Sequence, residues 1–114
     1  MPTVRSAKAK GKKLEKYLEK EIQELTGLDG DHVRANIGSE TGMDINLSKV
    51  AREKFPFAVE AKARARCVVY DFFKQAMTNS EGLYPMVVVK ADRQPPLAIL
   101  DWGVFKELCK CLKA

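Results

Sequence analysis

The stretch Met43–Lys62, MDINLSKVAREKFPFAVEAK, decides the expected fold because apolar and polar residues alternate at both of its ends. Residues 43–47 alternate with a period of two, which is typical of a strand with one buried face. Phe55–Ala61 alternates in the same way. Because Glu60 and Lys62 lie two residues apart, they are expected to project from the same side of this second strand.

The residues on either side of this stretch predict three helices and three further strands. The spacing of apolar residues predicts helices over residues 12–25, 64–79 and 102–112. Strands are predicted near Val33–Ile37, Pro85–Ala91 and Leu97–Asp101, and a short polar excursion is predicted over Ser48–Lys54. The expected order is therefore αβββαββα, an α/β fold in which a mixed β-sheet is flanked by helices.

The length of 114 residues suits one compact domain, which we expect over residues 13–114 after a basic arm over residues 1–12. The net charge of +5 resides in the first 20 residues, where seven Lys or Arg face two Glu. A basic segment can bind a phosphate backbone by releasing counterions, although a solvated tail explains it equally well. The lysines expected to follow the backbone are Lys8, Lys10, Lys12 and Lys13.

Composition disfavours several other classes of protein. Three cysteines, an odd number, argue against a disulfide framework and suit a reducing cytoplasm. No apolar run approaches membrane-spanning length, so no membrane association is expected. The one histidine, His32, lies in a polar segment and is expected to be a solvated surface residue, so a histidine-based metal site lacks its ligands. No GxxxxGK[ST] motif is present, and hence no nucleotide cofactor is expected.

The predicted strands bring acidic residues together at one place. Asp44 belongs to the polar face of one strand, and the neighbouring strand carries Glu60 and Lys62. Two converging carboxylates repel unless a divalent cation or a shared proton lies between them, and all-oxygen ligation suits Mg²⁺, with Mn²⁺ as a substitute. A lysine beside them can stabilise negative charge or orient water. The alternative is that Glu60 and Lys62 form an ion pair and Asp44 is an ordinary strand-edge acid.

The same residues carry a resemblance to a known family. The pattern Lys10-Gly11-x-x-x-Glu15, followed by Arg34, Ser39, Asp44 and Glu60-x-Lys62, resembles the archaeal-type Holliday junction resolvases. Segments such as GSETGMDINLS, FPFAVEAKA and PMVVVKADR resemble small phage-encoded endonucleases of the same PD-(D/E)xK superfamily. The resemblance implies a restriction-endonuclease-like core over residues 13–114.

The resemblance also implies roles for individual residues. Asp44, Glu60 and Glu15 would ligate Mg²⁺, although Glu15 could equally be a surface acid that pairs with Lys12 or Lys16. Gln75 would orient a water molecule or a metal ligand, unless it simply faces solvent. Arg34 and Ser39 would contact phosphates of the DNA.

The expected function is magnesium-dependent hydrolysis of DNA phosphodiester bonds, with four-way junctions as the favoured substrate. Cutting two symmetric strands needs two active sites related by a two-fold axis, so a chain with one site is expected to act as a homodimer. The alternatives are a nicking or homing-type endonuclease on duplex DNA and a non-catalytic DNA-binding module of the same fold.

Overall fold

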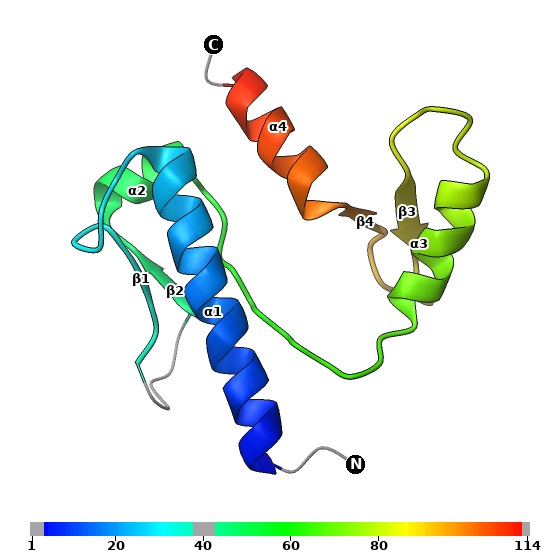
Figure 1. The fold of residues 1–114 in the computed structure, drawn as a ribbon. Coiled ribbons are helices and arrows are strands. Elements are labelled where there is room, and N and C mark those ends of the chain that lie inside the picture. The colour runs from blue at the N-terminus through cyan, green and yellow to red at the C-terminus, as the bar shows by residue number, and fades with distance from the viewer. Residues whose placement is uncertain (1–3, 38–42, 113–114) are drawn as a thin grey trace. The chain divides into compact units, whose positions relative to one another are not determined.

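The computed structural model describes residues 4–37 and 43–112, which divide into two compact units, Met1–Ala65 and Arg66–Ala114 (Figure 1). The described residues form an α/β arrangement in the order α1, β1, β2, α2, α3, β3, β4, α4. None of the described helices combines the length and apolar character that a membrane span requires.

The first helix, α1 (Val4–Thr26), is longer than the pattern predicts and begins within the segment expected to be a basic arm. Its buried side chains Leu18 and Ile22 are four residues apart, which places them on one face of the helix. The helix ends at Gly27, whose positive φ of 73° belongs to the left-handed region that glycine adopts without steric cost. The Gly27 N–H donates to the carbonyl of Gln23 at 2.8 Å and so closes the last turn.

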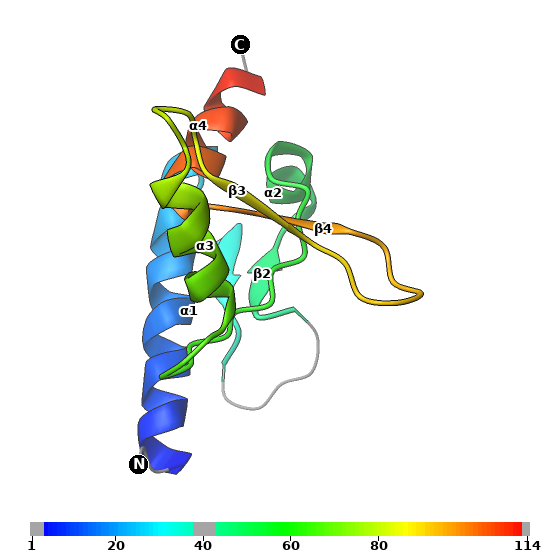
Figure 2. The same ribbon diagram turned by 90° about the vertical axis from the view of Figure 1, so that its right-hand side faces the viewer.

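Strands β1 (Val33–Ala35) and β2 (Ile45–Leu47) form an antiparallel pair in which Arg34 lies opposite Asn46. Figures 1 and 2 show this hairpin beside α1, and the residues on both sides of Arg34 and of Asn46 are buried. Helix α1 also satisfies the free edge of β1. Glu19 Oε2 accepts the N–H of Ala35 at 2.6 Å, and Gln23 Nε2 donates to the carbonyl of Val33 at 2.9 Å. These two bonds occupy backbone groups that would otherwise offer an edge for pairing with another chain.

Residues expected to form a polar excursion instead include a short helix, α2 (Lys49–Lys54). Ser48 caps it, because its hydroxyl oxygen accepts the N–H of Ala51 at 3.1 Å. Ala51 and the following Phe55 are buried. They complete a core whose apolar members are Leu18, Ile22, Val33, Ala35, Ile45, Leu47, Ala51 and Phe55.

The strand predicted over Phe55–Ala61 is wrong, because this segment runs outside any sheet. Pro56 has no N–H to donate, and the Phe57 N–H bonds back to the carbonyl of Phe55 at 2.9 Å. One backbone bond to the hairpin is present, from the Asp44 N–H to the carbonyl of Val59 at 3.2 Å. Apolar and polar residues therefore alternate along this segment although it lacks the ladder of backbone hydrogen bonds that defines a strand.

The second unit contains α3 (Val69–Thr78), β3 (Met86–Val89), β4 (Leu97–Leu100) and α4 (Trp102–Leu112). These elements confirm the two predicted strands and the last helix, whereas α3 begins five residues later than expected. Strands β3 and β4 pair with each other, antiparallel, and α3 packs on β3. The described residues thus form two separate two-stranded antiparallel sheets, and the expected mixed sheet is absent from them. The α/β class is confirmed, and the restriction-endonuclease-like core stays a prediction.

Candidate active site

Asp44 is the residue that joins the hairpin to the Glu60-x-Lys62 motif. It lies immediately before β2, where its backbone carbonyl accepts the N–H of Asn36 at 2.8 Å. Its side-chain oxygen Oδ2 accepts the N–H of Ala61 at 2.7 Å. A carboxylate oxygen that accepts a backbone N–H at this distance forms a strong, charge-assisted bond. The bond holds Asp44 against the residue that separates Glu60 from Lys62.

Glu60 and Lys62 form an ion pair, with 3.1 Å between Glu60 Oε1 and Lys62 Nζ. Their side chains are 64% and 61% exposed, so water screens most of the attraction. The interpretation of these two residues as an ion pair, one of the alternatives drawn from the sequence, is confirmed. It does not exclude a role in chemistry, because a solvated ion pair is easily broken when a ligand arrives.

Glu15 faces the same end of the hairpin from α1. Its side chain is 15% exposed, and its Oε1 lies 4.0 Å from Lys12 Nζ. Lys12 in turn donates to the carbonyl of Asn36 at 3.3 Å, and Asn36 is the backbone partner of Asp44. A pocket of about 270 Å³ is lined in part by Glu15, Glu19 and Asn36. Pairing of Glu15 with Lys12 therefore occurs, yet Glu15 is largely covered and is no ordinary surface acid.

The carboxylates do not converge into a metal centre in the described residues, where no three His, Cys, Asp or Glu side chains are placed to hold an ion together. Their donor chemistry nevertheless suits Mg²⁺, since Asp44, Glu60 and Glu15 offer oxygen atoms alone. An ionised carboxylate has about four lone-pair sites, so the bond from Ala61 leaves Asp44 able to accept further partners. The Glu60 carboxylate likewise keeps acceptor sites beyond the one that Lys62 contacts.

The remaining residues expected at the site have less close connections to Asp44. Gln75 lies exposed on α3, in the second unit, and its role stays a prediction. Ser39 lies outside the described residues. Arg34 is exposed on β1 opposite Asn46. The predicted backbone-tracking lysines are exposed on α1, at positions Lys8, Lys10, Lys12 and Lys13.

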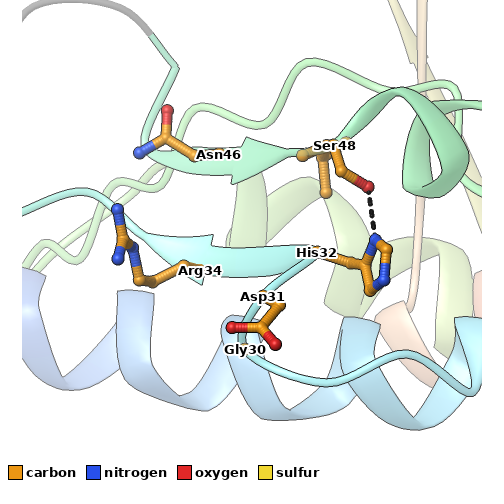
Figure 3. A pocket seen from close by; sticks show the side chains of 7 residues that line it. Gly30, Asp31, His32, Arg34, Asn46 and Ser48 are labelled. Carbon is orange, nitrogen blue, oxygen red and sulfur yellow. Dashed lines mark hydrogen bonds between the residues drawn. The ribbon is translucent and has the colours of Figure 1, made fainter.

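The sequence interpretation of His32 is wrong, because the ring is partly buried and hydrogen-bonded. Its Nδ1 lies 2.8 Å from Ser48 Oγ, and the Ser48 N–H donates to the His32 carbonyl at 2.8 Å (Figure 3). Both residues line a second pocket together with Arg34 and Asn46. The signal that could have found Asn46 and His32 is the period-two alternation itself, which places them on the polar face of the hairpin.

Comparison with known proteins found no matching family model, no similar curated protein and no similar solved structure. Membership of the PD-(D/E)xK superfamily therefore stays a prediction from the resemblance that the residues of this chain carry.

Proposed function

We propose that the chain is a divalent-metal-dependent DNA endonuclease whose active site is formed by Asp44, Glu60 and Lys62. The observation that carries the proposal is the 2.7 Å bond from the Ala61 N–H to Asp44 Oδ2. It attaches a partly buried carboxylate to the residue between an exposed acid and an exposed lysine, although these residues are far from Asp44 in sequence. Metal-dependent hydrolysis of a phosphodiester can use carboxylates to hold the ion and a lysine to stabilise negative charge, provided that they are open to a bulky substrate.

The residues have separate tasks in the proposed reaction. Asp44 and Glu60 would hold Mg²⁺ or Mn²⁺, with Glu15 as a third carboxylate. When bound, such an ion supplies Lewis-acid stabilisation of the phosphodiester oxygens. Lys62, released from Glu60, would donate hydrogen bonds to the negative charge that develops on the phosphate or orient the attacking water. The exposed lysines on α1 would bind the DNA backbone.

Within this class we propose that four-way junctions are the substrate and that the active form is a homodimer. The resemblance to junction resolvases supports the substrate, and the need for two cuts related by symmetry supports the dimer. Cleavage of a four-way junction, a linear duplex and a flap of matched sequence tests the substrate. Equal cutting of all three would exclude junction specificity, while leaving the endonuclease proposal in place.

Two substitutions test the chemistry. Glu60→Gln and Lys62→Ala are expected to slow cleavage by roughly 10²–10⁴-fold while DNA binding persists. The matched controls are Glu53→Gln and Lys49→Ala on α2, which change the same residue types at exposed positions and should leave the rate within about threefold of wild type. Cleavage should stop in EDTA and return with excess Mg²⁺.

The second candidate is a DNA-binding module without catalysis. It is favoured by one observation, namely that Glu60 and Lys62 satisfy each other in a solvated ion pair. Binding of junction DNA without any cleavage in Mg²⁺ or Mn²⁺ would select this candidate over the endonuclease.

A further inference from the structure

The outward face of the β1–β2 hairpin is polar at every position. Register places Arg34 opposite Asn46, and two flanking backbone bonds extend the ladder. The Ser48 N–H donates to the His32 carbonyl, and the Asn36 N–H donates to the Asp44 carbonyl, both at 2.8 Å. Three cross-strand pairs therefore share one side of the ladder, namely His32 with Ser48, Arg34 with Asn46, and Asn36 with Asp44; Asn36 is buried, and the exposed part of this face is formed by the other two pairs. The inward positions between them are all buried and apolar, and comprise Val33, Ala35, Ile45 and Leu47.

A pocket of about 270 Å³ lies on this face (Figure 3). Its lining includes side chains from both strands and from the turn before β1, namely Asp31, His32, Arg34, Asn46 and Ser48. The bond between His32 Nδ1 and Ser48 Oγ fixes the imidazole as one wall. Arg34 and Asn46 form the exposed centre of the face and extend from neighbouring strands (Figure 3).

The chemistry of this lining suits the edge of a nucleobase better than a phosphate. A phosphate oxygen only accepts hydrogen bonds, so a phosphate site needs donors. Here the guanidinium of Arg34 is a donor, the amide of Asn46 both donates and accepts, and the carboxylate of Asp31 only accepts. Asp31 would repel a phosphate, whereas it can accept from the exocyclic amine of a cytosine.

We infer that this face of the hairpin reads base edges in the DNA, with Arg34 and Asn46 as the reading residues. The inference rests on the proposed endonuclease function and gives it a sequence preference. A two-stranded antiparallel ribbon fits the major groove, where arginine pairs with guanine O6 and N7, and asparagine pairs with adenine N6 and N7. Asp44 lies two residues from Asn46 along the chain, roughly 7 Å in an extended backbone, so base contacts would lie next to the proposed catalytic carboxylate.

The test selects DNA from a pool of junctions with randomised arms, using the full chain in EDTA so that bound DNA is not cut, and sequences the bound fraction. We expect enrichment of guanine and adenine at neighbouring positions. A protein that cleaves DNA in Mg²⁺ but selects no sequence would overturn the inference and leave the endonuclease intact. A protein that binds no DNA would overturn both.

Substitutions at the two reading residues separate base contacts from phosphate contacts. Arg34→Lys keeps the positive charge but loses the planar fork that matches guanine. It should reduce the guanine preference roughly 10- to 100-fold, with little change in the affinity for unselected DNA. Asn46→Ala should relax the adenine position alone. Both side chains are exposed, and circular dichroism should show the fold unchanged.

A different set of results would show that Arg34 contacts a phosphate and not a base. If Arg34→Ala weakened binding to all sequences alike and lowered the salt dependence by about one phosphate equivalent, while Arg34→Lys behaved as wild type, Arg34 would be a phosphate contact. Lys49→Ala is the control for a loss of affinity that is the same for all sequences. Lys49 is an exposed cation on α2 that lies outside the pocket, so this variant removes a positive charge without changing the pocket.

Discussion

The two units of this chain contain similar elements but differ in what those elements bury. In the first unit, a helix and a hairpin enclose a core in which Ile22, Val33 and Ile45 are completely covered. In the second unit, two helices and a hairpin leave every described residue at least partly exposed. Burial of apolar side chains is the main favourable term in folding, so the first unit carries most of the stabilisation that the described structure shows.

The difference also separates the functional residues. Asp44, Glu60, Lys62 and Glu15 belong to the first unit, where the bond from the Ala61 N–H to Asp44 Oδ2 ties the segment of Glu60 and Lys62 to the start of β2. Gln75 belongs to the second. A rigid framework holds side chains in place for chemistry, whereas a weakly packed one does not. We therefore expect substitutions in the first unit to have larger effects, both on cleavage and on stability.

The largest expected effect is on cleavage. Asp44→Asn removes the charge but keeps an oxygen that can accept the Ala61 N–H, so the fold should persist while cleavage falls by at least roughly 100-fold. Gln75→Ala in the second unit should cost less than about tenfold, which corresponds to about 1.4 kcal/mol of transition-state stabilisation. Single-turnover rates on junction DNA measure both. Equal losses would show that Gln75 of the second unit matters as much for cleavage as Asp44 of the first unit.

The second expected effect is on stability and uses a matched pair of apolar residues. Ile45→Ala, at a position with 0% exposure, should lower the free energy of unfolding by about 2–5 kcal/mol. Leu97→Ala on β4, which is 61% exposed, should lower it by less than about 1 kcal/mol. Urea unfolding followed by circular dichroism gives both values. A loss at Leu97 as large as the loss at Ile45 would mean that an apolar contact covers the second unit in solution.

The third effect concerns the edge of β1. Glu19→Ala leaves the Ala35 N–H without its 2.6 Å acceptor, and the unfolding free energy should fall by about 1–3 kcal/mol. Glu107→Ala on α4, where the carboxylate forms an exposed ion pair with Lys110 at 3.3 Å, should change it by less than about 0.5 kcal/mol. The same urea titration applies. A neutral result at Glu19 would show that water replaces the carboxylate at this edge.

Much of this arrangement could be predicted from local pattern. The alternation around Ile45, the β-branched run of β3 and the helical spacing of α1 each predicted an element that is present. The alternation of apolar and polar residues predicted a strand wrongly around Pro56, because proline lacks the backbone N–H that a sheet requires. Local pattern also failed for α2, because a short helix capped by Ser48 has too few turns to show a period.

The candidate site, too, could be predicted from the sequence only in part. Sequence proposed Asp44, Glu60 and Lys62 as a group, and the structure joins Asp44 to their segment. The means of joining was not predicted, because a side-chain bond to a backbone N–H leaves no periodic signal. His32 was misjudged for a related reason: its partner Ser48 lies 16 residues away, and only the strand register brings the two together.

The smallest expected effect compares how the helices of the two units begin. Ser48 accepts the Ala51 N–H at the start of α2, so Ser48→Ala should lower the unfolding free energy by about 1 kcal/mol. At the start of α3 the corresponding residue, Val68, makes no side-chain capping bond and is 62% exposed, so Val68→Ala should have almost no effect. Thermal unfolding of the two variants beside wild type measures the difference.

Loss of the serine hydroxyl also removes the partner of His32, and Ser48→Thr retains a hydroxyl for both bonds. If Ser48→Thr restored stability and Ser48→Ala did not, the hydroxyl would be the group that stabilises this corner of the first unit; if both variants matched wild type, the two units would not differ in how their helices are held.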